Sequence, residues 1–293
     1  EIDHNYVIAK NTITGPGILD NSVSVGVLAS LPVICRHLNL RFESDILLAA
    51  VPQSIGKGNL QGIKHLIDTW DGPIRGAVIM EGEKLGRLSY YSEGIIRGEI
   101  VCNVTATNGW EHRYKPNAII ILNKVIDEIL AMELPQRPLS RIIIGKIQGG
   151  FKHGVIAYDA RLGFEIQSDS EEMVRRMHSE LKDIVSGIGH ENHVSLKLNI
   201  ISNLTPAKLS YRHPLVKSTV VIMRTLGLKP ITDSSESGAF YFPARKIPAV
   251  TLGVTEGKTC TGKNASMKIT PMFTGIAQVL GVPMAIDTGV CDE

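Results

Sequence analysis

Two kinds of hydrophobic pattern divide the chain. Near both ends, short and nearly continuous apolar runs alternate with segments in which apolar residues recur every three or four positions. Continuous runs are typical of strands buried on both faces, and strands that alternate with helices favour a parallel sheet. The two ends therefore predict one α/β domain with helices on both faces of its sheet. Its predicted strands are 46–51, 77–80 and 248–254, and its predicted helices are 20–37, 59–70, 215–226 and 270–280.

The middle of the chain has a period of two instead. A strand with one buried face is predicted by the alternation with polar residues of Ile96, Ile100, Cys102 and Val104. A helix from residue 116, two strands around the turn at 149–154, a helix capped by Asp169 and a strand at 194–200 follow. This β-α-β-β-α-β order is the ferredoxin-like arrangement, with two helices on one face of an antiparallel sheet. We expect 93–203 to form an inserted domain, and 1–92 with 204–293 to form the discontinuous α/β domain.

Composition and charge restrict the classes of function. The chain has 43% hydrophobic and 20% charged residues, which is ordinary for a globular protein, and a net charge of +2 with scattered Lys and Arg. A nucleic-acid partner is therefore not expected. The apolar runs at 23–34 and 118–132 are shorter than the roughly 20 residues that cross a bilayer, so no membrane partner is expected either. The four cysteines show no Cys-x-x-Cys spacing, which favours reduced thiols in a cytoplasm.

Several short strings along the whole chain carry a family resemblance. They are the glycine-rich turn at 15–22, Gly-Asn-Leu-Gln-Gly at 58–62, Glu-Gly-Glu-Lys-Leu-Gly-Arg at 81–87, the insert strings at 115–119 and 145–150, and the late strand at 247–253. Because these strings occur in this order, the chain resembles the zinc peptidases and aminoacylases that include acetylornithine deacetylase, glutamate carboxypeptidase and tripeptidase. The resemblance implies a catalytic-like α/β domain and a lid or dimerisation insert, with a homodimer formed through residues 93–203.

The resemblance also implies a metal site. A cocatalytic zinc hydrolase needs two metals held by His and carboxylate ligands, and a carboxylate base for the bridging water. Asp20 matches a metal-bridging Asp, and Glu81 matches an acidic ligand. Cys260 stands near the position of a late ligand His, and a thiolate can hold zinc. Each has a structural alternative: Asp20 as a helix cap, Glu81 as a solvent-exposed carboxylate and Cys260 as a small buried residue.

Other parts of this chemistry are missing from the sequence. No His-x-Asp motif occurs in the chain, and Ser54 and Ile55 align with the family's paired glutamates. Isoleucine cannot bind zinc, and neither residue replaces a carboxylate base. We expect a catalytically inactive or strongly impaired relative with a binding role, with zinc weakly bound or absent and a peptide or amino-acid-like ligand. The alternative is a zinc-dependent hydrolase of peptide or N-acyl amino acid amide bonds, with further ligands from a segment upstream of Glu1.

Overall fold

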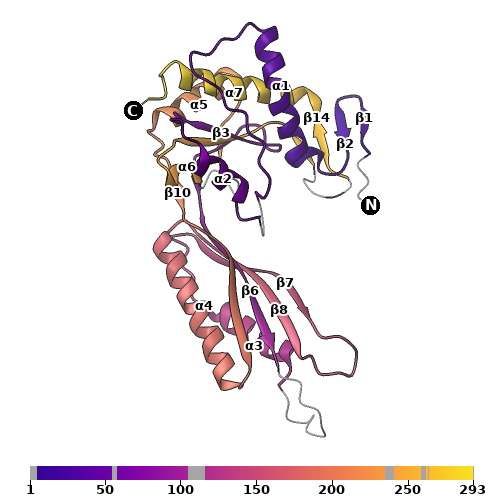
Figure 1. Ribbon diagram of the computed structural model, residues 1–293. Helices are drawn as coiled ribbons and strands as arrows, with labels where there is room; N and C mark the ends of the chain where they lie inside the picture. Colours follow the sequence, from indigo (N-terminus) through magenta and orange to yellow (C-terminus); the bar gives the residue numbers. More distant parts are fainter. Residues whose placement is uncertain are drawn as a thin grey trace. The chain divides into compact units, whose positions relative to one another are not determined.

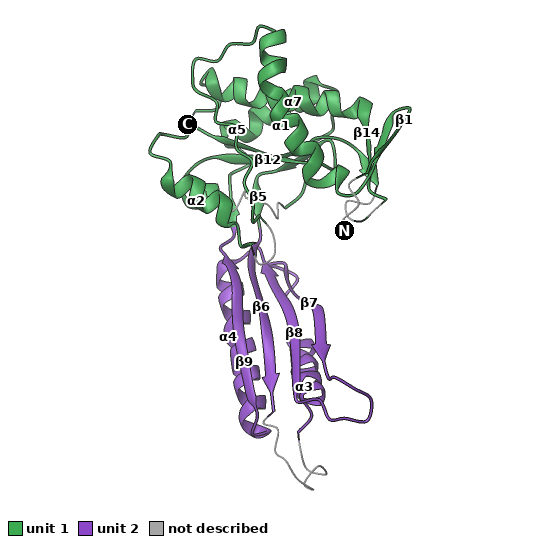
Figure 2. Ribbon diagram, turned by 45° about the vertical axis from the view of Figure 1, so that its right-hand side comes forward, with its two compact units in different colours: residues 1–92, 207–293 green, residues 93–206 purple. Residues whose placement is uncertain are grey.

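The computed structural model describes residues 5–54, 58–104, 116–234, 241–258, 262 and 264–292. The chain divides into two compact units, shown in different colours in Figure 2. Unit 1 consists of Glu1–Ser92 and Ala207–Glu293, and unit 2 of Glu93–Pro206. The fold as a whole is mixed α/β.

Unit 2 has the order of elements expected from the sequence. Its elements are β6 (Gly94–Asn103), α3 (Ala118–Ala131), β7 (Ser140–Gly149), β8 (Asp159–Ser168), α4 (Glu171–Glu191) and β9 (Ser195–Leu204). The strands form one sheet in the order β7-β8-β6-β9, and all neighbours are antiparallel. This is the ferredoxin-like strand order, and Figure 2 shows both helices on the same side of the sheet.

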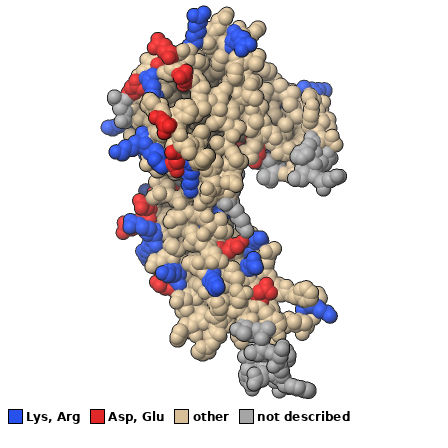
Figure 3. All heavy atoms as spheres, in the orientation of Figure 1, with Lys and Arg blue, Asp and Glu red and all other residues tan. Residues whose placement is uncertain are grey.

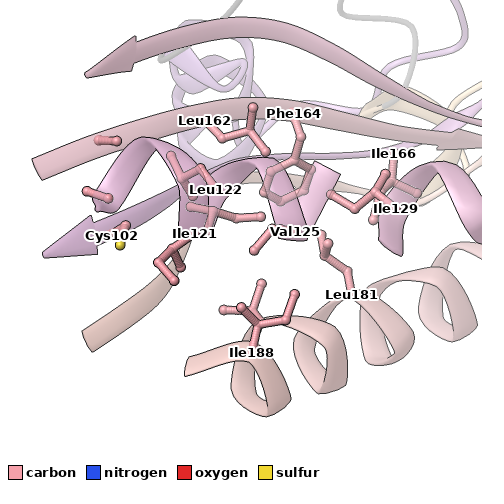
Figure 4. Close-up of a cluster of buried hydrophobic side chains, with 14 of the residues drawn as sticks. Cys102, Ile121, Leu122, Val125, Ile129, Leu162, Phe164, Ile166, Leu181 and Ile188 are labelled. Carbon is pink, nitrogen blue, oxygen red and sulfur yellow. The ribbon is translucent and has the colours of Figure 1, made fainter. Parts of the chain in front are cut away.

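The core of unit 2 lies between the sheet and its two helices (Figure 4). Alternate residues of β6 and β8 point into it, while α3 and α4 contribute side chains spaced by three or four positions. Both helices begin with a side-chain cap: Asn117 accepts from Ile119 N at 3.0 Å, and Ser170 accepts from Met173 N at 3.3 Å. The predicted cap Asp169 is therefore wrong by one residue, because the Ser170 hydroxyl takes that place.

Unit 1 contains a mixed sheet, not the parallel one that was predicted. Its order is β11 (Ile231–Thr232), β4 (Arg87–Ser89), β12 (Ala249–Gly253) and β3 (Ala77–Glu81). β12 is parallel to β3 and β11 to β4, whereas β12 and β4 are antiparallel. Only a short turn joins β3 to β4, which leaves no room for the crossover helix that a parallel connection needs. β4 therefore runs opposite to β3 and β12.

Helices from both ends of the chain surround this sheet. They are α1 (Val23–His37), α2 (Gln61–Thr69), α5 (Pro214–Thr225), α6 (Tyr241–Ala244) and α7 (Ile269–Asp287). In Figures 1 and 2, α5 and α7 lie on one side of β3 and β12, and α2 lies on the other. Residues of α1, α5, α7 and the strands share one hydrophobic core.

Smaller sheets complete unit 1. One has the order β1 (Val7–Ala9), β2 (Thr12–Thr14), β14 (Ser266–Lys268) and β13 (Gly257–Lys258), and β5 (Tyr91–Ser92) pairs with β10 (Ala207–Lys208). The strand predicted at 46–51 is wrong: this segment forms no strand, and the side chains of Ile46, Leu47 and Leu48 are exposed.

Two helical segments, Ile18–His37 and Ile269–Asp287, are long and apolar enough to cross a membrane by length and composition. The first is longer than the apolar run at 23–34 suggested. Both contribute to the core of unit 1, for example through Val27 and Val279. Core helices of globular domains can have the same length and apolar composition. On the face that Figure 3 shows, acidic and basic side chains are interspersed.

Candidate functional site

Asp20 lies in an irregular turn before α1. The turn is a π-helical segment, Ile18–Ser22, entered through Gly17 in the left-handed conformation (φ 65°). Asp20 itself is non-helical, with φ −88° and ψ −108°. The N-cap of α1 is Ser22, and no side chain caps that helix by a hydrogen bond. The structural alternative for Asp20, a helix cap, is therefore wrong, and its half-buried carboxylate requires another explanation.

The segment after β3 closely approaches the backbone of the Asp20 turn. A Cβ atom on Gly82 would lie 1.8 Å from the carbonyl oxygen of Leu19 and 2.5 Å from that of Asp20. Only glycine permits this approach, which brings the segment that carries Glu81 and Glu83 against the Asp20 turn. Burial raises the pKa of Asp20 above its usual value, and the negative charge of Glu83 raises it further.

Glu81, the other expected acidic ligand, is not a solvent-exposed carboxylate. Its side chain is 20% exposed and forms an ion pair with Arg87, whose side chain is 9% exposed. Arg87 also donates from Nη2 to the carbonyl oxygen of Ser234 at 2.6 Å and from Nε to Ser89 Oγ at 3.2 Å. The guanidinium therefore holds Glu81 within a set of hydrogen bonds that links β3, β4 and the end of β11.

A second carboxylate belongs to the same set. Asp233 Oδ2 lies 3.2 Å from Lys84 Nζ and 3.6 Å from Arg87 Nη2. Burial acts to raise the pKa of Asp233, but the Lys84 hydrogen bond and the positive charges of Arg87 and Lys84 outweigh it and lower the pKa below its usual value. The carboxylates of Glu81 and Asp233 are thus balanced by two cations of the chain itself.

Sequence reasoning missed the role of Arg87. It was noted only as the last residue of the 81–87 string, and its side chain was assigned no contact. The burial of the three-residue strand that Arg87 begins, with Leu88 at 0% exposure, is visible only in the structure. An arginine buried at such a position requires an anionic partner, and the nearest acidic residues in the sequence are those of the same string.

The structure places the segments of two of the three predicted ligands side by side. The backbone of Gly82, which follows Glu81, lies against the backbone of Asp20, whereas Cys260 lies outside the described residues, as does Ile55. Ser54 lies within the described chain and its hydroxyl donates to Val51 O at 3.4 Å. Whether Asp20, Glu81 and Cys260 bind metal stays a prediction.

The described residues do not fit a zinc ion. Zinc prefers four ligands drawn from His nitrogen, Cys sulfur and carboxylate oxygen. In the ranges that the structure describes, no group of three or more His, Cys, Asp or Glu side chains is arranged to hold a metal. Glu81 would also have to leave Arg87 before it could bind a cation.

Comparison with protein-family models and with curated proteins gives no match to the sequence. Solved structures do match. A tripeptidase from Staphylococcus aureus is 17% identical with a TM-score of 0.76, covering 97% of this chain and 76% of that one. Aminopeptidase PepT from Bacillus cereus is 15% identical with a TM-score of 0.69, covering 96% of this chain and 76% of that one. Human carnosine dipeptidase 1 is 10% identical with a TM-score of 0.71, covering 97% and 75%.

These matches define the class of the fold. The chain has the fold of these peptidases, whose names are those of an aminopeptidase, a tripeptidase and a dipeptidase. The resemblance inferred from the short sequence strings is confirmed at this level.

Proposed function

We propose that this chain is a catalytically inactive or strongly impaired relative of the zinc peptidases, with a role in binding a peptide or amino-acid-like ligand. The fold supports the ancestry, since the match extends over nearly the whole chain. The side chains near Asp20 support the loss of catalysis, because the carboxylates that would hold zinc are incomplete or already paired.

The ion pair between Glu81 and Arg87 is the observation that carries the proposal. A metal that took Glu81 would leave the guanidinium of Arg87, at 9% side-chain exposure, without its closest partner. Leaving a buried charge fully uncompensated typically costs about 3 kcal/mol or more, and Asp233, 3.6 Å from Arg87 Nη2, offsets part of that cost here. That cost opposes metal binding. The chain therefore stabilises Glu81 with an internal cation in place of a metal.

The missing general base also lowers the expected rate of hydrolysis. Loss of a positioned general base typically lowers the rate by about a hundredfold to ten-thousandfold. Ser54, at one of the two positions aligned with the paired glutamates, has a hydroxyl that does not act as a base near neutral pH. An incomplete ligand set and a missing base should therefore combine to give a very slow hydrolase or none.

The test measures metal content and turnover in the same samples. The unmodified chain should hold much less than two zinc ions per protomer by elemental analysis. Added zinc or cobalt should give no hydrolysis of acetylated amino acids or small peptides. Arg87→Gln should raise zinc affinity several-fold by isothermal titration, because it frees Glu81 and removes a positive charge. Arg75→Gln is the matched control, since Arg75 pairs with Asp292 at an exposed position.

The opposite result would favour the alternative function, a zinc-dependent hydrolase. Stoichiometric zinc in the unmodified chain, with turnover that disappears in Asp20→Ala, would overturn the proposal. Equal zinc affinity of Arg87→Gln and the unmodified chain would show that the Glu81 pair is not what limits metal binding.

We further propose that the chain forms a homodimer through residues 93–203, with the surface of α3 and β7 as the contact. β7 is an edge strand of the sheet of unit 2 and lies beside α3. Large apolar side chains are exposed on these two elements: Ile119, Ile120, Leu130, Ile143 and Ile147. On β9, the other edge strand, the exposed side chains include Lys197 and Asn199, and Ile200 is the exposed large apolar residue. A polar edge resists pairing with another chain and an apolar one favours it.

Ile147→Lys tests this surface. Light scattering should give twice the 31.9 kDa of one chain for the unmodified protein, and a shift towards the monomer for the variant. Asn199→Lys adds the same charge to the other edge and should leave the mass unchanged. A monomer throughout the micromolar range, or an equal effect of both variants, would contradict the assignment.

A further inference from the structure

A cavity of about 480 Å³ lies in unit 1, and its lining residues include none of Asp20, Glu81 and Arg87. Its lining comes from the turn before α5, from α5 and from the segment leading into β11, and includes Tyr211, Val220, Arg224, Leu228, Lys229 and Thr232. None of the described residues that line it is acidic. We propose that this cavity binds a small organic anion with an apolar body, and that Arg224 and Lys229 hold its charged group.

The end of α5 builds one wall of the cavity. Gly227 follows the helix with φ 75°, a conformation that favours glycine, and the chain turns back along α5 towards β11. The amide of Gly227 donates to Arg224 O at 3.0 Å, and the amide of Leu228 donates to Met223 O at 2.8 Å. This turn places Leu228 and Lys229 opposite residues of the helix.

The two cations are available to a ligand. Basic residues near the end of a helix often interact with its unsatisfied carbonyl groups. Here the amides that follow α5 already occupy carbonyl groups of its last turn, so the Arg224 side chain is not required for that purpose. Both Arg224 and Lys229 are exposed, and neither takes part in an ion pair within the described part of the chain. Arg75, Arg87 and Arg245 of the same unit, by contrast, have carboxylate partners.

The remaining lining defines the rest of the ligand. Val220, Leu228 and Pro230 supply apolar surface, and the ring of Tyr211, tilted against Tyr90 at 6.1 Å between centroids, adds an aromatic wall. The Thr232 hydroxyl and the Tyr211 phenol can donate hydrogen bonds. A volume of this size suits a ligand of one ring or a branched chain. The combination fits an aromatic or branched carboxylate, whose charge the two cations would contact through charge-assisted hydrogen bonds.

The experiment compares an anion with its neutral amide. Phenylpropionate and phenylpropionamide are titrated into the unmodified full chain by isothermal calorimetry. The carboxylate should bind saturably and the amide about tenfold or more weakly, since the amide lacks the charge. Arg224→Gln with Lys229→Gln should weaken binding of the carboxylate by about tenfold or more and leave that of the amide nearly unchanged.

Arg212→Gln with Lys217→Gln is the matched control, because it removes the same two charges from positions that do not line the cavity. Its effect should be under about twofold, because exposed charges that do not contact the ligand are screened by salt. Hydrogen exchange should show slower exchange with phenylpropionate in peptides covering 211–232. Equal binding of acid and amide, an equal loss in the control, protection elsewhere, or no saturable binding of phenylpropionate would each overturn the proposal. None of these results depends on metal at Asp20 and Glu81.

Discussion

Unit 2 and the sheet of unit 1 show how differently a hydrophobic pattern can relate to a fold. Each strand of unit 2 is ten residues long, and all four are paired with neighbours from one continuous stretch of chain. The strands of the β11-β4-β12-β3 sheet have at most five residues, and they come from both ends of the chain. Long alternating strands therefore reveal their arrangement in the sequence, whereas short buried strands depend on turns that periodicity does not show.

The largest expected effect on stability tests whether unit 2 unfolds independently of unit 1. Leu122 is at 0% exposure in that core, and Leu122→Ala should lower the free energy of unfolding of unit 2 by about 2 to 5 kcal/mol through lost burial and a cavity. Hydrogen exchange during urea unfolding should show the loss in peptides of unit 2 and not in those of unit 1.

Ile120→Ala on the same helix is the control, because Ile120 is 58% exposed and the change should cost about 0.5 kcal/mol or less. An equal loss of protection in both units of Leu122→Ala would show that the two units unfold as one.

A smaller effect is expected where unit 1 depends on a close approach. Gly82→Ala would force its Cβ against the carbonyl oxygens of Leu19 and Asp20, so the backbone must shift. We expect a loss of about 1 to 3 kcal/mol in unfolding free energy, measured by urea denaturation, as is typical of overpacking.

Gly26→Ala provides the contrast. Gly26 lies within α1, and no heavy atom lies within 4 Å of the place where its Cβ would be. This change should stabilise the protein by about 0.5 to 1 kcal/mol through helix propensity. If both glycine variants behaved alike, the contact between the Gly82 segment and the Asp20 turn would not be what holds this region together.

The contrast between the long strands of unit 2 and the short strands of unit 1 explains which predictions from the sequence succeeded. The helix predicted after Asp169 forms as α4, and its apolar residues Val174, Met177 and Leu181, spaced by three or four positions, are buried. The apolar run at 46–48 looked like a buried strand, but those side chains are exposed, because an apolar run does not show whether a neighbouring strand is present to cover it.

The candidate site was only partly predictable for a related reason. The positions of Asp20 and Glu81 followed from a resemblance between short strings, and the structure brings the two segments together at Gly82. The partner of Glu81 did not follow, since Arg87 reaches it only because the chain turns back into β4. Such a contact depends on the direction of a three-residue strand, and a strand of that length has too few residues to show a period.

The smallest expected effect concerns the charge of the Asp20 site. Burial and Glu83 raise the pKa of Asp20 in the folded state above that of the unfolded chain. The protonated form is then favoured by folding, so the contribution of Asp20 to stability is fully present below the unfolded pKa and is lost as the pH rises through the folded pKa. Asp20→Asn should remove this loss and raise stability at neutral pH relative to the unmodified chain.

Asp233 should behave in the opposite way. Its pKa is lowered, because Lys84 and Arg87 outweigh the effect of burial, so its contribution is present above the unfolded pKa and is lost as the pH falls through the folded one. Asp233→Asn should therefore lower stability at neutral pH. Urea midpoints of the two variants and the unmodified chain, measured from about pH 3 to about pH 7, compare the two carboxyl groups directly.

Glu83→Gln should reproduce part of the Asp20→Asn effect, because Glu83 is the second cause of the raised pKa of Asp20. A parallel pH dependence of Asp20→Asn and Asp233→Asn would show that the chain's own cations do not distinguish the two carboxylates, and the account of Arg87 as an internal substitute for a metal would then lose its electrostatic basis.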